Sequence, residues 1–151
     1  MSVQLHPAAL VWAERCLRRV PVVYTRGIDR RDWELVRSCF ADDAFVAGSR
    51  TTSTLDEYFP QLRIGVEYFP ATMHFVGNQI VDVAEDGWSG HVETYAVAYH
   101  WRGDPPGAEH PENLVMGVRY DDDIAEVAGE WRITRRSVTA DWHRGVFPPL
   151  G

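Results

Sequence analysis

The feature that most constrains the fold of this chain is a change in the spacing of its apolar residues near Thr72. Before that position, apolar residues recur at steps of three and four, which is the spacing of one helical face. After it, long stretches are rich in valine and aromatic side chains, which favour strands. Helices followed by a run of long strands predict an α+β fold, with the helices on one face of a mostly antiparallel sheet.

The first helix is expected to follow Pro7, with an apolar stripe of Leu10, Ala13, Leu17, Val20 and Tyr24. Pro21 falls inside this stripe and predicts a kink or a short break, because proline cannot donate the helical hydrogen bond. Gly27 predicts the way out of the helix. Asp29 would then lie just beyond the helix end, close in space to Tyr24 in the last turn.

Two shorter helices are expected next. Asp32 is a typical N-cap residue and predicts a short second helix. After a short strand at residues 44–47, Ser53 or Thr54 predicts the start of a third helix. Pro60 lies inside the apolar pattern of that helix, so the sequence is compatible with one helix or with two pieces.

Four long strands are expected after Thr72: residues 73–83, 88–101, about 113–120 and 130 to about 140. The three aspartates at residues 121–123 either finish the third of these strands or begin a turn. Long strands that curl over about three N-terminal helices would form a cone-shaped sheet around an internal apolar pocket. The chain has 151 residues and no internal repeat, which predicts a single domain over residues 1–151.

The charge of the chain limits its partners. A formal net charge of −7, with no basic stripe, argues against a nucleic acid and against an anionic membrane. No apolar run approaches the roughly 20 residues that span a bilayer, and the charged N-terminal stretch lacks a signal-peptide core. Cys16 and Cys39 have no metal-type spacing, which favours free thiols in a reducing compartment. We therefore expect a cytoplasmic protein.

The first candidate for chemistry is His74, inside an apolar, strand-like segment at residues 72–78. Near neutral pH a histidine can take or give a proton, so one that faces an apolar cavity is suited to general acid–base catalysis. The alternative is a core histidine that is bonded to a backbone carbonyl. The residue pattern leaves both interpretations open.

Asp29 and Tyr24 are candidates to act together with His74. A buried carboxylate beside an imidazole fixes the tautomer and stabilises the imidazolium. The alternative for Asp29 is a turn or cap residue, although Asp32 is better placed to cap. Tyr24, with an ordinary pKa of about 10, would donate a hydrogen bond to a substrate oxygen. Its alternative is a core aromatic residue.

Three further residues are candidates for substrate binding: Asn78, Glu93 and His100. Asn78 could hold a substrate carbonyl or hydroxyl group, or it could serve a bulge after Gly77. Glu93 and His100 share a strand, and alternation places them on opposite faces of the sheet. Only one of these two side chains can point into the cavity, and the pattern does not say which.

Other charged segments are assigned to the surface. Arg119 and Arg135 lie in expected strands and could place a cation in the pocket, although paired surface arginines are the preferred interpretation. Residues 91–93 and 141–143 contain metal-ligand residue types, but each segment supplies only two ligands. Residues 121–123 lack the spacing, the glycine and the closing glutamate of a calcium loop. We therefore predict no metal site.

Three segments form a set: Tyr24-x-x-Gly27-x-Asp29-x-x-Asp32-Trp33, then Phe40-Ala41-Asp42-Asp43-Ala44, then Thr72-Met73-His74-Phe75-x-Gly77-Asn78. A closing Trp131-Arg132-Ile133, followed by Arg135, completes it. Together these segments resemble the SnoaL-like family of the nuclear-transport-factor-2-like superfamily. The resemblance covers nearly the whole chain.

The resemblance implies a cone-shaped α+β barrel with a deep apolar pocket. In the dehydratase and dehydrochlorinase members of the family a His–Asp dyad removes a proton, and His74 and Asp29 stand at the matching positions. Tyr24 matches a tyrosine that one dehydratase uses. The implied function is a cofactor-independent lyase or isomerase that acts on a small, hydrophobic, cyclic molecule. Family members also imply a homodimer or a homotrimer.

Two alternatives remain for the function. One is a polyketide-type cyclase, which closes a ring by an intramolecular aldol step and needs the same acid–base pair in a wider pocket. The other is a non-catalytic module for ligand binding or assembly. The second alternative predicts that His74 and Asp29 do not touch, or that Trp142 or Phe147 from the C-terminal tail fills the pocket.

Overall fold

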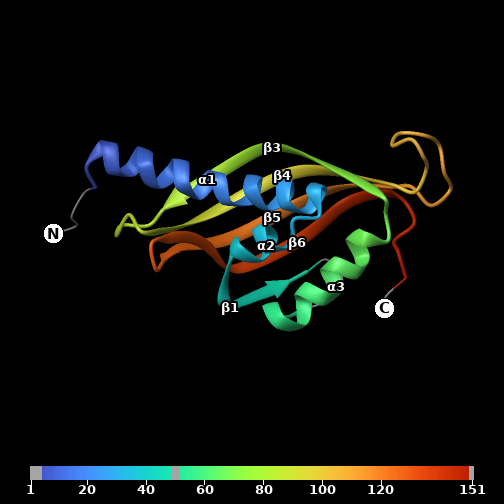
Figure 1. Ribbon diagram of the computed structural model, residues 1–151. Coiled ribbons are helices and arrows are strands. Elements are labelled where there is room, and N and C mark those ends of the chain that lie inside the picture. Colours follow the sequence, from blue (N-terminus) through green and yellow to red (C-terminus); the bar gives the residue numbers. More distant parts are fainter. Residues whose placement is uncertain (1–4, 49–51, 150–151) are drawn as a thin grey trace.

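The computed structural model describes residues 5–48 and 52–149 of the chain. In this part the elements are α1 (Pro7–Arg30), α2 (Trp33–Ser38), β1 (Phe40–Ala47), β2 (Thr52–Thr54), α3 (Leu55–Glu67), β3 (Ala71–Val83), β4 (Ser89–Trp101), β5 (Leu114–Val127) and β6 (Glu130–Gly145). The predicted α+β fold is confirmed, with the helices in the first half of the chain and the long strands in the second (Figure 1).

The first helix carries most of the apolar stripe that the sequence predicts. Its buried apolar residues recur at the expected spacing: Ala13, Leu17, Val20, Tyr24 and Ile28. Leu10, which we expected in the stripe, is 43% exposed. The helix runs through Pro21 without a break. No helix in residues 5–48 and 52–149 is long and apolar enough to cross a membrane.

Gly27 has a different role from the predicted one. It lies inside α1, and the helix continues past it. A Cβ atom at Gly27 would come within 2.7 Å of Val36 Cγ2, so the missing side chain lets α2 pack closely against α1. Arg31 supplies the left-handed C-cap instead, at a φ of 56°. Asp29 consequently lies in the last turn of the helix and not beyond it.

The two shorter helices begin at predicted caps. Asp32 Oδ1 accepts a hydrogen bond from the N–H of Leu35 (3.0 Å) at the start of α2. At the start of α3, the N–H of Thr54 donates to the Glu57 carboxylate (3.3 Å). α3 is one continuous helix that contains Pro60. The short strand β2, directly before it, was not predicted.

The strands form one curved, open sheet in the order β2-β1-β6-β5-β4-β3. Neighbouring strands are antiparallel except for β1 and β6, which are parallel. β5 continues through residues 121–123, and β6 extends to Gly145, so both strands are longer than predicted. The helices lie on one side of the sheet, and α1 runs along β3 (Figure 1).

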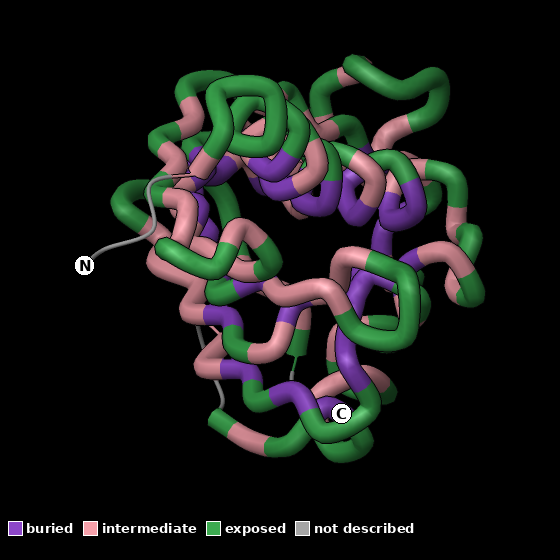
Figure 2. The backbone as a smooth tube through the Cα atoms, turned by 90° about the vertical axis from the view of Figure 1, so that its left-hand side faces the viewer, coloured by how far each residue is buried: buried purple, intermediate pink, exposed green. Residues whose placement is uncertain are grey.

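Alternation along the strands separates an inner face, which packs on the helices, from an outer face. Inner side chains of β4 and β5 are buried: Val92, Thr94, Ala96, Ala98, Leu114, Met116, Val118, Tyr120, Asp122 and Ile124. Figure 2 shows the buried segments gathered toward the middle of the molecule. One hydrophobic cluster joins these strands to α1, α2, α3 and β1, so the described elements share a single core.

Candidate active site

The last turn of α1 and the start of β3 bring Asp29 and His74 together. Asp29 Oδ1 lies 2.8 Å from His74 Nδ1, and Asp29 Oδ2 accepts a hydrogen bond of 2.8 Å from the backbone N–H of His74. One carboxylate therefore holds both the ring and the backbone of the histidine. The side chain of His74 is 6% exposed and that of Asp29 is 23% exposed. The contact that the dyad hypothesis requires is present.

The ionised state of Asp29 fixes the tautomer of His74. Burial by itself raises the pKa of Asp29, but hydrogen bonds from His74 and Thr72 outweigh burial and hold the pKa below its ordinary value. A carboxylate only accepts hydrogen bonds, so Nδ1 of His74 carries the hydrogen in this contact. Nε2 of the neutral imidazole then keeps its lone pair and can accept a proton.

His100 is the substrate-binding candidate that reaches this site. It lies on the inner face of β4, with its ring centroid 6.0 Å from that of His74 and 5.0 Å from that of Phe69. Burial, and secondly the nearby His74, lower the pKa of His100 to about 4, so the ring is neutral at pH 7. Its Nδ1 lies 3.3 Å from the carbonyl oxygen of Leu114, which leaves the lone pair on Nε2.

Glu93 and Asn78, the other two candidates, lie on the outer side of the sheet. Glu93 forms an ion pair with Arg119 (3.6 Å). Asn78 is exposed in the β3 bulge and lines an outer groove of about 220 Å³ together with Tyr95 and Trp142. His74 lies on the opposite face. Neither residue can therefore contact a substrate that is bound at the dyad, which corrects our interpretation of both.

Tyr24 lies in a buried aromatic cluster between α1 and the inner face of the sheet. Its ring packs edge-on against Phe40 and Tyr120, with centroid distances of 5.8 Å in both cases. Burial raises the pKa of Tyr24 well above its ordinary value, so the hydroxyl keeps its proton and remains a hydrogen-bond donor at neutral pH.

Arg136 belongs to the same cluster, and the sequence analysis missed it. Its side chain is 0% exposed, and Nε and Nη2 donate to the two oxygens of Asp122 at 2.7 Å each. The guanidinium carbon lies 4.1 Å from the ring centroid of Tyr24 and 4.5 Å from that of Tyr120. Nη1 is buried and has no hydrogen-bond partner among the described residues. An unpaired buried donor is unfavourable, which makes Nη1 a candidate for binding a ligand oxygen.

A bulge explains why the orientation of Arg136 was not predicted. Ile133 is buried, and strict alternation from it would turn Arg135 inward and Arg136 outward. The register between β5 and β6 shifts by one residue at Thr134, which reverses the alternation. No turn residue marks this position in the sequence, so no local signal was present. Arg135 is exposed, as expected for a surface arginine.

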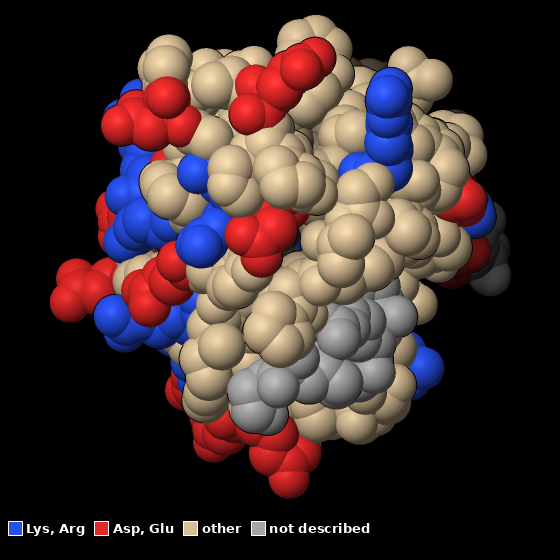
Figure 3. All heavy atoms as spheres, turned by 90° about the vertical axis from the view of Figure 1, so that its right-hand side faces the viewer, with Lys and Arg blue, Asp and Glu red and all other residues tan. Residues whose placement is uncertain are grey.

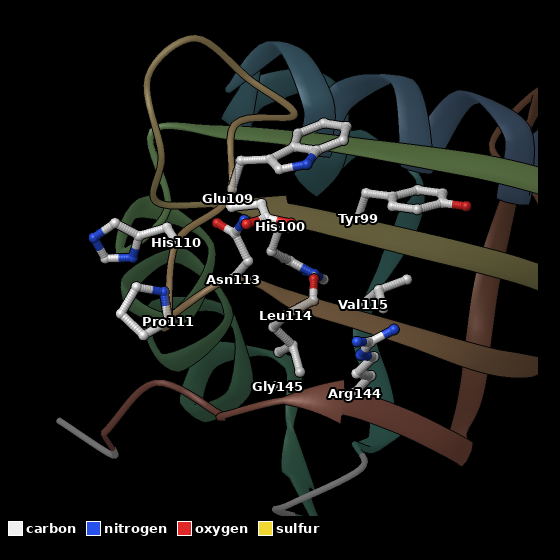
Figure 4. Close-up of a pocket in the computed structure, with 11 residues that line it drawn as sticks. Tyr99, His100, Glu109, His110, Pro111, Asn113, Leu114, Val115, Arg144 and Gly145 are labelled. Atoms are coloured by element: carbon white, nitrogen blue, oxygen red, sulfur yellow. The ribbon is translucent and has the colours of Figure 1, made fainter.

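A cleft of about 690 Å³ opens at the end of the sheet, where β4, β5 and β6 meet the loop at residues 102–113. Figure 4 shows His100 near its centre, Glu109 and Asn113 from the loop on one side, and Arg144 on the other. Most of the strand side chains that line the cleft, such as Tyr99, Val115 and Arg144, lie on the outer face of the sheet. His100 is at its edge, and its ring lies 6.0 Å from that of His74 on the inner face. Charged side chains of both signs surround a mostly uncharged area at this end of the molecule (Figure 3).

The structure also bears on the non-catalytic alternative. That alternative predicts a separated His74 and Asp29, which is not observed. Trp142 does not fill the interior: it is 51% exposed on the outer face, over Gly117, where a Cβ atom would lie 2.2 Å from the indole Nε1. Phe147 packs against the core and contacts the ring of His143.

The structure also describes both cysteines and the clusters of potential metal ligands. Cys16 and Cys39 are free thiols, as predicted. Among residues 5–48 and 52–149, no group of three or more histidine, cysteine, aspartate or glutamate side chains could hold a metal ion.

Comparisons with other proteins agree with this fold. The sequence profile of the SnoaL-like domain matches residues 10–137. The uncharacterized protein Rv2910c of Mycobacterium tuberculosis strain H37Rv is 28% identical over 127 residues, which are 82% of each chain.

Two solved structures extend the comparison. A scytalone dehydratase-like protein from Novosphingobium aromaticivorans has a TM-score of 0.80 at 21% identity, over 97% of this chain and 95% of its own. A hexachlorocyclohexane dehydrochlorinase, LinA type 2, has a TM-score of 0.76 at 13% identity, over 97% and 99% of the two chains. At such identities the similarity shows a common fold.

Proposed function

The chain belongs to the SnoaL-like family of the nuclear-transport-factor-2-like superfamily, and on that basis we propose that it is a cofactor-independent lyase or isomerase acting on a small, hydrophobic, cyclic substrate. The observation that carries the proposal is the contact between Asp29 and His74. It directs Nδ1 of His74 to Asp29 and leaves Nε2 as the nitrogen that can take a proton, in a nearly dry position where Asp29 stabilises the imidazolium that forms.

In the proposed reaction, Nε2 of His74 takes a proton from a carbon next to a carbonyl group. The electron pair of that C–H bond forms an enolate. In an elimination, the enolate expels a hydroxyl group from the neighbouring carbon; the hydroxyl takes up a proton and leaves as water, and His74 returns to its neutral form. In an isomerisation, the same proton returns to a different carbon.

The developing enolate oxygen needs hydrogen-bond donors. We propose that two groups of the buried cluster would serve as these donors: the Tyr24 hydroxyl, whose raised pKa keeps it protonated, and the unpaired Nη1 of Arg136. Donors that are fixed in a buried position stabilise negative charge far better than donors in water. Both groups would therefore lower the barrier to enolate formation, and Arg136 adds a role that the sequence did not indicate.

His100 has a different proposed role. With a pKa of about 4 it cannot serve as a cationic acid at neutral pH. Its Nε2 can accept a hydrogen bond from a substrate hydroxyl, which would orient the substrate beside His74.

The proposal is tested with a panel of small cyclic β-hydroxy ketones and β,γ-unsaturated ketones, followed by the absorbance of the conjugated enone product. His74→Gln is expected to reduce kcat by roughly 10²- to 10⁴-fold, because it removes the general base. His91→Gln is the matched control: this histidine lies on the outer face, with a side chain 43% exposed, and its replacement should leave turnover unchanged. Equal rates in the wild type and His74→Gln contradict the proposal.

We also propose that the chain forms a homodimer or a homotrimer through the outer face of its sheet. Large apolar side chains are exposed there: Phe75 at 70%, Met73 at 56% and Trp142 at 51%. Exposed apolar groups that lie together favour association. Phe75→Lys should shift the mass measured by light scattering toward the monomer. Val11→Lys, at a position on α1 that is 65% exposed, is the control and should not change the mass.

A further inference from the structure

Arg31 connects three elements close to the dyad. It is the C-cap of α1, and its guanidinium group bonds to residues at the start of β3 and at the end of α3. Nη1 donates to the Thr72 hydroxyl (2.8 Å) and to the Ile28 carbonyl (2.8 Å). Nη2 donates to the Phe69 carbonyl (2.7 Å) and weakly to that of Val66 (3.4 Å). This single side chain therefore joins the ends of both long helices to the strand that carries His74.

The hydrogen bond from Arg31 fixes the direction of the Thr72 hydroxyl. A guanidinium group has no acceptor, so the Thr72 oxygen must accept the hydrogen from Arg31. The hydroxyl hydrogen of Thr72 is then available to Asp29, and Thr72 Oγ1 lies 3.0 Å from Asp29 Oδ1. The result is an ordered chain in which each donor points the same way: Arg31 to Thr72, and Thr72 to Asp29.

Asp29 is consequently bonded on both oxygens. Oδ1 accepts hydrogen bonds from the Thr72 hydroxyl and from Nδ1–H of His74, and Oδ2 accepts one from the backbone N–H of His74. Three donors around a half-buried carboxylate leave it no freedom to rotate. Such a carboxylate stays ionised and keeps its partner imidazole in one tautomer.

We propose that Arg31 and Thr72 are positioning residues: they lock the Asp29 carboxylate in the orientation that holds His74 with Nδ1 protonated and Nε2 free. Neither residue touches the reacting atoms, and the inference rests on the proposed function only for its effect on the rate. Thr72 acts on Asp29 directly, and Arg31 acts through Thr72. Arg31 also bonds to the Phe69 carbonyl, and the Phe69 ring contacts His100. Arg31 therefore also supports the position of His100, the second imidazole of the site.

The test uses Thr72→Val, which keeps the shape of the side chain and removes the hydroxyl. Thr25→Val is the matched control: Thr25 is a threonine of similar burial (4% against 8%) whose hydroxyl bonds to the Val22 carbonyl in α1. Thr72→Ser restores the hydroxyl. The readouts are the titration midpoint of the Asp29 carboxyl group by ¹³C NMR and the ring-nitrogen shifts of His74 by ¹⁵N NMR, neither of which needs a substrate.

In Thr72→Val the Asp29 midpoint should rise by about one pH unit, because a carboxylate that loses a donor is less stabilised in its charged form. The ¹⁵N shifts should show a mixture of the two His74 tautomers. Thr25→Val and Thr72→Ser should match the wild type. With any proven substrate, kcat of Thr72→Val should fall roughly ten- to a hundredfold at little change in KM.

Arg31→Lys is the second variant, since lysine keeps the charge but cannot bond to Thr72 and to the Val66 and Phe69 carbonyls together. It should move the Asp29 midpoint in the same direction. Wild-type midpoints and His74 shifts in both variants overturn the proposal, whatever the turnover. If the Asp29 midpoints move as expected while His74→Gln retains full turnover, the positioning role of Arg31 and Thr72 is supported and the proposed function is not.

Discussion

The buried ion pair between Asp122 and Arg136 gives the sharpest stability prediction. Both side chains are 0% exposed and share two contacts of 2.7 Å. Asp122→Asn keeps the size of the side chain and removes its charge, so the guanidinium group remains buried without a counter-ion. Breaking a buried pair in this way costs about 3–5 kcal/mol of unfolding free energy.

The surroundings of Arg136 indicate the lower part of that range. Two unit charges about 4 Å apart attract by about 4 kcal/mol at an effective dielectric constant of about 20. Asparagine keeps a side-chain oxygen that can accept a hydrogen bond from the guanidinium group, so part of the interaction between residues 122 and 136 survives in the variant. We expect a loss of about 3 kcal/mol, or roughly 6–12 °C in Tm for a domain of this size.

Urea unfolding at pH 7 measures the effect, and the protein supplies its own control. Arg119 binds Asp141 with the same bidentate geometry, at 2.7 and 2.8 Å, but the two side chains are 31% and 38% exposed. Asp141→Asn should therefore lower the free energy of unfolding far less than Asp122→Asn does, because an exposed ion pair contributes little. Equal losses in Asp122→Asn and Asp141→Asn refute the reasoning, because they mean that the interior solvates the guanidinium group as water does.

The double replacement Asp122→Leu with Arg136→Met separates stability from function. It removes both charges together, and replacing a buried pair by apolar side chains of similar volume is nearly neutral or stabilising. The free energy of unfolding of this variant should lie within about 1–2 kcal/mol of the wild-type value. It lacks Nη1 of Arg136, so it should be folded and show a reduced kcat.

Three further predictions concern other elements. The His91–Asp123 hydrogen bond raises the pKa of His91 despite partial burial, so its stabilisation is fully present below about pH 6.5 and is lost as pH rises through the raised value. The difference in unfolding free energy between the wild type and His91→Asn should thus be larger at pH 5.5 than at pH 8, and an equal difference contradicts this. Gly27→Ala should destabilise by about 1–3 kcal/mol in urea unfolding, because the new Cβ meets Val36 at 2.7 Å. Gly65 lies in α3, and a Cβ atom there would meet no atom within 4 Å. Gly65→Ala should therefore stabilise the protein by about 0.5–1 kcal/mol. Equal effects at the two glycines would rule out the packing argument.

The fold was predictable because its apolar residues keep a regular spacing over long segments. The stripe from Ala13 to Tyr24 and the run of strands after Thr72 depend on local spacing, and local spacing is what a sequence shows directly. The contact between Asp29 and His74 joins residues 45 positions apart. Family motifs, and not periodicity, indicated that contact.

The errors have a common physical cause, which is that they depend on contacts between distant elements. Gly27 was taken as a helix end, but the side chain that requires a glycine there is Val36, from the next helix. Arg136 was missed because one extra residue, Thr134, reverses the alternation of β6. The Arg31–Thr72 contact spans 41 residues and has no local pattern. Such features appear only when the elements are packed together.

The central claim is that His74 removes a proton from carbon, and hydrogen–deuterium exchange tests it most directly. The protein is incubated in D₂O with small cyclic ketones, and deuterium at the carbon next to the carbonyl group is followed by NMR. Exchange reports proton abstraction even when no leaving group departs. We predict catalysed exchange in the wild type that falls by roughly 10²- to 10⁴-fold in His74→Gln. Ketones that bind, but exchange no faster with the wild type than with His74→Gln, contradict the claim.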